Sequence, residues 1–140
     1  MADRFQYREL EHTGDLAIEV TAPSRAELFA GALVAMARLM VAGDGIEPRD
    51  RREIAITADT DVDRLHDLLA DALNLFLIDG FIWSAADVSE PNSSVTATLT
   101  GEKFDSKRHE LIEEIKAVTY HCLAVEQTGD AWRATIIFDA

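Results

Sequence analysis

The sequence predicts a single compact α+β domain over residues 1–140, in which mostly antiparallel or mixed β-sheet packs with two long helices and one short helix. Strand-like segments outnumber helical ones, and the two kinds do not alternate strictly as they do in βαβ folds. Two segments repeat apolar residues at helical spacing. The chain also has the length of one domain, with no internal repeat and no long linker.

Two short strands are expected near the N-terminus. Residues 5–10 alternate, and residues 16–21 place Leu16, Ile18 and Val20 on one side. The polar residues 11–15 separate the two segments and include a glycine. A pair of strands joined by a polar turn is the simplest interpretation.

The two long helices have recognisable ends. The first follows Pro23, where Ser24 and Glu27 have the spacing of a capping box, and it ends before residues 43–45, whose glycines permit a left-handed stop. The second begins at about Thr60 with aspartates in its first turn, which favour the positive end of a helix. Residues 79–80, Asp-Gly, close it. His66 falls on the polar side of this helix and needs no function.

The rest of the chain is expected to form strands and one short helix. Further strands are predicted at residues 51–57, 81–88, 95–99, 115–127 and 132–139. The short helix is predicted at residues 106–113.

The last two strands predict a specific register. If Gln127 pairs with Trp132, then Glu126 faces Arg133, an opposite-charge pair that supports a sheet. A slip of one residue would carry apolar side chains to the other face.

The same register makes predictions near the C-terminus. It places Asp139 opposite Tyr120, on the same face as Lys116, so the C-terminal carboxylates and Lys116 come close. It also places His121 on the apolar face, where a histidine is more often a hydrogen-bonded core residue than a ligand. Cys122 next to it is excluded as a dyad partner, because neighbours on a strand point to opposite faces.

The charge balance limits the possible partners. Asp and Glu number 26 against 13 Lys and Arg, which gives a formal net charge of −13. Such a surface repels phosphate backbones, so the chain is not expected to bind nucleic acid by itself; it favours cations or a basic protein partner. The single cysteine excludes an intramolecular disulfide and a Cys-rich zinc site. No signal peptide or membrane-spanning stretch is visible, so a cytoplasmic protein is expected.

Candidate metal ligands gather near both ends of the sequence. Residues 11–15 read Glu-His-Thr-Gly-Asp, so His12 and Asp15 flank a turn glycine. Asp139 is followed by Ala140, whose terminal carboxylate is a further donor. Oxygen-rich sets suit hard divalent cations. On spacing alone, Asp15 is better explained as a turn residue that bonds its own backbone, and Asp139 as a solvated charge at a frayed end.

Four motifs taken in order resemble the archease family, from Tyr7 to Ala140. They are Glu-His-Thr-Gly-Asp at residues 11–15, Gly-Glu at 101–102 with Asp105 and His109, Glu-Ile-Lys-Ala-Val-Thr-Tyr-His at 114–121, and Ile-Phe-Asp-Ala at 137–140.

The resemblance implies a metal site formed by Asp15, Asp139 and the carboxylate of Ala140, with His12 as a further candidate. It implies a divalent ion, calcium first, with magnesium or manganese as alternatives. It also implies that Lys116, with Asp15 and Asp139, acts in ligase activation.

The family likeness further implies an accessory protein and no catalytic residues. Such a protein activates an RtcB-type RNA ligase, promoting its guanylylation and multiple turnover in tRNA splicing or RNA repair, and meets RNA only through the ligase. Two alternatives stay open. One is a metal-dependent hydrolase that uses the same carboxylates with His12, and the other is an acidic protein-interaction module.

Overall fold

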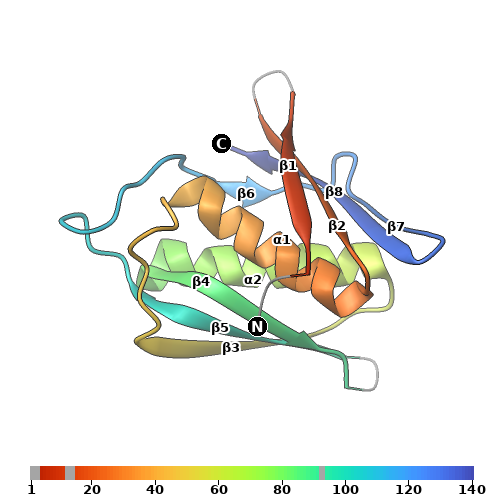
Figure 1. Ribbon diagram of the computed structural model, residues 1–140, viewed down its shortest axis with the longest axis horizontal. Coiled ribbons are helices and arrows are strands. Elements are labelled where there is room, and N and C mark those ends of the chain that lie inside the picture. Colours follow the sequence, from red (N-terminus) through yellow and green to blue (C-terminus); the bar gives the residue numbers. More distant parts are fainter. Residues whose placement is uncertain (1–3, 12–14, 92–93) are drawn as a thin grey trace.

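The computed structural model describes residues 4–11, 15–91 and 94–140, and shows two helices between two antiparallel sheets (Figure 1). Both helices contact strands of both sheets. The elements are β1 (Gln6–Leu10), β2 (Leu16–Ala22), α1 (Arg25–Met40), β3 (Asp50–Thr57), α2 (Asp61–Asp79), β4 (Phe81–Ser89), β5 (Ser94–Lys103), β6 (Ala117–Val118), β7 (Ala124–Thr128) and β8 (Ala131–Asp139). The predicted α+β class with two long helices is therefore confirmed.

The larger sheet joins the two ends of the sequence. Its order is β1-β2-β8-β6, and β7 also pairs with β8. The predicted N-terminal hairpin is present, since β1 pairs antiparallel with β2. The β2–β8 ladder runs from Ala22 opposite Trp132 to Leu16 opposite Phe138. The start of β2 therefore lies beside the end of β8.

The smaller sheet has the order β3-β5-β4. An irregularity lies between Trp83 and Ala85 of β4, where the register on β5 shifts. Gly101 of β5 is opposite Trp83, and a Cβ added there would lie 1.9 Å from the Ile82 carbonyl oxygen. Only glycine allows the two backbones to approach so closely.

Side-chain caps fix the N-termini of both helices. The Ser24 hydroxyl accepts from the Glu27 N–H at 3.2 Å and donates to the Glu27 carboxylate at 2.8 Å. Thr60 caps α2 by accepting from the Asp63 N–H at 3.1 Å. These bonds satisfy amides that lack a partner within the helix.

The C-termini of the helices differ. Gly80 ends α2 in the left-handed region, at φ 72°. The first helix ends where expected, but the prediction of a glycine stop is wrong, because Val41 caps it in extended conformation. There the chain joins an isolated bridge with Leu111, so a tertiary contact ends α1.

One hydrophobic core is shared by both helices and both sheets. Its largest fully buried side chains include Trp83, Phe29, Phe81 and Phe138. The Trp83 ring N–H donates to the Leu33 carbonyl at 2.9 Å, so its polar atom is satisfied in the interior. Among the described residues, no helix is both long and apolar enough to cross a bilayer.

The predicted short helix at residues 106–113 is wrong. Residues 106–108 form a turn, and the chain then passes the end of α1 without helix, making a single bridge at Leu111. The Ile112 N–H donates to the Met40 carbonyl at 2.7 Å, and the Ala42 N–H donates to the Glu110 carbonyl at 3.0 Å. The segment bonds the open end of α1 instead of bonding itself, which is a common way for tertiary structure to override local preference.

The predicted strand at residues 115–127 is interrupted. It forms β6 and β7 with a turn at residues 121–122, where Cys122 has φ 54°. The register of the β7–β8 hairpin is confirmed, including the Glu126–Arg133 pair. The placement of Tyr120 opposite Asp139 is wrong. The residue paired with Asp139 is Ala117, three positions before Tyr120.

The interruption also corrects two expectations about the turn. His121 is exposed instead of lying in the core. The Cys122 Sγ lies 3.7 Å from His121 Nε2, so the strand argument for keeping the two side chains apart does not apply.

Candidate functional site

Three segments that are distant in sequence meet at the C-terminal end of β8. The β2–β8 ladder ends at Leu16 opposite Phe138, so Asp15 and Asp139 are the next residues on these two adjoining strands. On the other side of β8, Ala117 of β6 pairs with Asp139, and the Lys116 N–H donates to the Asp139 carbonyl at 2.7 Å. Figure 1 shows the C-terminus beside β6.

The side chains of this meeting point lie at the surface. Lys116, Asp139 and Ala140 are exposed, and Asp15 is partly buried. The structure therefore brings Asp15, Asp139 and Lys116 onto adjacent segments through the backbone. His12, the further metal candidate, lies outside the described residues.

The donors present are of the type that a hard cation requires. Asp15 and Asp139 supply carboxylate oxygens, and Ala140 follows directly after Asp139. In the described part of the chain, no three His, Cys, Asp or Glu residues are grouped as metal ligands. A site here would thus combine two side-chain carboxylates with main-chain oxygen.

A second set of contacts connects α2 to the same region. His66 Nε2 donates to the Val118 carbonyl of β6 over 3.2 Å, and the His66 ring stacks on Tyr120 with 3.9 Å between centroids and 16° between planes. The Tyr120 hydroxyl donates to the Asp63 carboxylate at 2.9 Å. This bond and partial desolvation raise the pKa of Tyr120.

Sequence reasoning missed this group, since it assigned His66 no function. The histidine and Val118 are 52 positions apart, and no local pattern connects them.

The buried carboxylate of Glu102 forms a separate cluster, from the Gly-Glu motif with Asp105 and His109. Glu102 is 3% exposed and accepts from the Glu47 N–H at 2.6 Å, from His109 Nε2 at 3.1 Å and from the guanidinium of Arg108. Arg49 lies at 3.5 Å from it. The Arg108 hydrogen bond is the main reason that the pKa of Glu102 falls to about 2.

The proton on His109 is fixed by its neighbours. The Asp105 N–H donates to Nδ1 at 2.9 Å, so Nε2 carries the proton and donates to Glu102. The His109 side chain is fully buried. The cluster thereby joins the loop before β3 and the turn after β5, which is a structural role.

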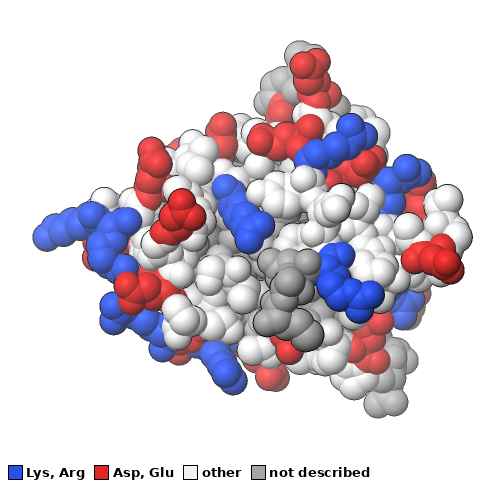
Figure 2. Space-filling view, in the orientation of Figure 1, with Lys and Arg blue, Asp and Glu red and all other residues white. Residues whose placement is uncertain are grey.

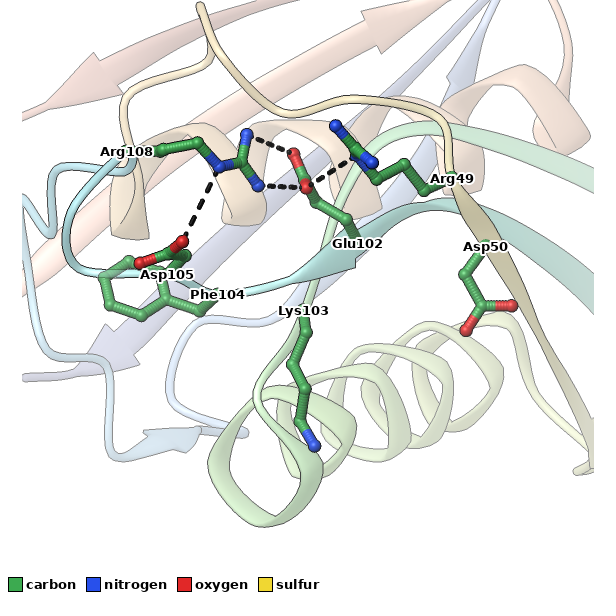
Figure 3. A pocket seen from close by; sticks show the side chains of 7 residues that line it. All are labelled: Arg49, Asp50, Glu102, Lys103, Phe104, Asp105 and Arg108. Atoms are coloured by element: carbon green, nitrogen blue, oxygen red, sulfur yellow. Dashed lines mark hydrogen bonds and ion pairs between the residues drawn. The ribbon is translucent and has the colours of Figure 1, made fainter.

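A pocket of about 440 Å³ opens beside the Glu102 cluster. Figure 3 shows its lining, formed by Arg49, Asp50, Glu102, Lys103, Phe104, Asp105 and Arg108. Positive and negative side chains balance across it. In Figure 2, Lys and Arg side chains gather at the left end of the drawn face, interleaved with Asp and Glu. Figure 1 shows the turn after β5 at that end, well away from the C-terminus.

Comparison with known proteins finds similarity to one protein family over nearly the whole chain. The model of the Archease protein family (MTH1598/TM1083) matches residues 7–140. The chain is 33% identical to the protein archease of Methanosarcina barkeri over 139 residues, which cover 96% of this chain and 95% of the relative. It is 34% identical to that of Methanopyrus kandleri over 137 residues, covering 95% and 98%.

Two solved structures share the fold. The solution structure of Methanobacterium thermoautotrophicum protein 1598 has a TM-score of 0.78 and 25% identity, covering 99% of this chain and 100% of that one. The crystal structure of a Thermotoga maritima archease, described as a possible chaperone, has a TM-score of 0.67 and 25% identity, covering 95% and 96%. The family model spans nearly the whole chain, so this protein belongs to the archease family.

Proposed function

We propose that this protein is an accessory factor that activates an RtcB-type RNA ligase and is not itself an enzyme. It promotes guanylylation and multiple turnover of the ligase in tRNA splicing or RNA repair, and it acts in the cytoplasm. Family membership supports the proposal, as does the description of the Thermotoga maritima relative as a possible chaperone. The net charge of −13 disfavours direct RNA contact, so RNA is reached through the ligase.

The meeting of Asp15, Asp139 and Lys116 around the end of β8 is the observation that carries the proposal. Asp139 ends β8, and Asp15 and Lys116 directly precede β2 and β6; Lys116 and Asp139 are exposed and Asp15 is partly buried, so a partner can reach this region. Asp15, Asp139 and the Ala140 carboxylate would hold a divalent cation, calcium first, with magnesium or manganese as alternatives. When bound, the ion supplies positive charge that offsets phosphate charge. Lys116 supplies an ammonium group for the same purpose.

The test is ligation at limiting ligase, with and without this protein. We expect Asp15→Ala, Asp139→Ala and Lys116→Ala each to lower the stimulation of turnover at least tenfold, because each removes a charged group from the end of β8. Circular dichroism should show that the variants stay folded.

Exposed residues elsewhere provide matched controls. Asp87→Ala on β4 and Lys107→Ala in the turn after β5 remove the same charges at other surfaces, and should keep full stimulation. If all three site variants stimulate as well as the wild type, the proposed site is wrong. Turnover of phosphoester substrates by the protein alone with divalent metal would instead favour a hydrolase. An acidic interaction module is favoured if a different protein target is captured and the ligase is not.

The cation can be tested without the ligase. Isothermal titration with calcium, and then with magnesium and manganese, should detect binding to the wild type and weaker binding by at least tenfold to Asp139→Ala. Asp87→Ala should bind as the wild type does. If Asp139→Ala binds the ions as tightly as the wild type does, the proposed metal site is wrong. Lys116 is then the remaining group that could offset phosphate charge.

A further inference from the structure

The strand β6 has few backbone contacts to hold it. It pairs with β8 through only two residues, Ala117 and Val118. Flanking bonds extend the pairing slightly, because the Lys116 N–H donates to Asp139 and the Thr119 N–H donates to Ile137. Its other edge faces α2, and no strand is paired there within the described residues. An unpaired edge leaves backbone groups that require other partners.

Side chains of α2 supply those partners. His66 Nε2 donates to the Val118 carbonyl, which lies on the edge of β6 that faces the helix. The His66 side chain is 19% exposed, and its Nδ1 lies 3.0 Å from the Asp67 carboxylate.

Tyr120 completes the set. It is 53% exposed, yet its ring is stacked on His66 and its hydroxyl is bonded to Asp63. Asp63 and His66 are three residues apart and therefore share one face of α2. A half-exposed aromatic ring with both its face and its hydroxyl engaged is held in one orientation, and so is the chain that carries it.

We propose that His66, Tyr120 and Asp63 form a positioning clamp that holds the Lys116–Tyr120 segment of the chain against the end of β8. The clamp acts through Val118 and Tyr120, which lie two and four residues after Lys116. None of its three side chains is among the residues assigned to the metal or to phosphate. The inference rests on the proposed function, because it gives the clamp a role in ligase stimulation.

His66→Phe is the first test, since it keeps a ring for stacking and removes both hydrogen bonds. We expect amide hydrogen exchange at Lys116 and Thr119 to become at least tenfold faster, with amides of α1 unchanged. Ligase stimulation should fall at least fivefold. In a Lys116→Ala background, His66→Phe should cause no further loss, because both changes act through one group.

Two further variants provide an alternative test and a control. Tyr120→Phe removes only the bond to Asp63, keeps the stack and carries the same expectations if His66→Phe fails to fold. Asn74→Ala changes an exposed position on the same helix and should leave exchange and stimulation as in the wild type.

Unchanged exchange at Lys116 and Thr119 in the folded variants would overturn the clamp. Faster exchange with full stimulation, where Lys116→Ala abolishes stimulation, would overturn its functional role. If Lys116→Ala itself stimulates fully, the proposed function of Lys116 fails, and the exchange rates alone then decide whether the clamp exists.

Discussion

Replacing Glu102 by glutamine should destabilise the protein in a way that depends on pH. The carboxylate is almost fully buried and its pKa is about 2, against 4.5 for an ordinary glutamate. A difference of about 2.5 units corresponds to roughly 3.4 kcal/mol at 1.36 kcal/mol per unit. The Arg108 and Arg49 side chains are 40% and 64% exposed, so solvent screens their charges. We therefore expect the ionised form to contribute about 2 kcal/mol.

The direction of the pH effect follows from the lowered pKa. The folded state holds the proton of Glu102 less tightly than the unfolded state does, so this contribution is complete above about pH 4.5. It is lost as the pH falls through about 2, below which folded and unfolded states both carry the proton. The stability difference between the wild type and Glu102→Gln should thus be about 2 kcal/mol at pH 7 and shrink toward pH 2.

Urea unfolding followed by circular dichroism measures this difference at pH 7, 5, 4, 3 and 2. Other carboxyl groups titrate in the same range, but they are common to both proteins and cancel in the comparison. Glu126→Gln, which disrupts the exposed pair with Arg133, serves as a control and should leave the unfolding midpoint unchanged. A Glu102→Gln protein as stable as the wild type at pH 7, or a difference that stays constant with pH, would refute the reasoning.

Two other substitutions test the fold itself, both by urea unfolding. Gly101→Ala places a Cβ 1.9 Å from the Ile82 carbonyl oxygen, so backbone must move and at least about 3 kcal/mol should be lost; wild-type stability would contradict the close approach of β4 and β5. Ser24→Ala removes the cap of α1 and should cost about 1 kcal/mol, whereas an unchanged midpoint would mean that water replaces the cap fully.

The parts of the fold that sequence predicts well are those decided by neighbouring residues. Both helices start directly after a residue that carries a capping hydroxyl, Ser24 or Thr60, because the amide that each hydroxyl caps is only three positions away. Gly80 ends α2 for a similarly local reason, since it adopts the left-handed conformation with little strain. The β7–β8 register also follows from a short turn that joins consecutive strands.

The errors lie where distant contacts decide the conformation. Residues 106–113 have a helical pattern, but the bond to the Met40 carbonyl at the end of α1, the bridge to Val41 and the buried cluster around Glu102 hold them in a different conformation. The break between β6 and β7 has a similar cause. His66 and Asp63 of α2 bind Val118 and Tyr120, and no pattern within residues 115–127 contains that information.

The candidate site was predicted only in part for the same reason. The motifs single out Asp15, Asp139 and Lys116, and the structure places all three on segments that adjoin the end of β8. The strand pairing predicted to bring Lys116 close to Asp139 was wrong, because it required one unbroken strand from Lys116 to Gln127. The observed break moves the partner of Asp139 from Tyr120 to Ala117 and brings Lys116 to Asp139 through a backbone bond instead.

One core residue connects the three segments of the site. Phe138 is fully buried and is paired with Leu16 across one ladder and with Val118 across the other. Asp15 and Asp139 are adjacent in sequence to Leu16 and Phe138, and Lys116 lies two residues before Val118. Because a packed core permits little displacement of its side chains, the surface charges are held where the interior fixes the strand ends. Charged residues can thus be accessible to a partner and still be ordered, since apolar packing one or two residues away in sequence holds their backbone in place.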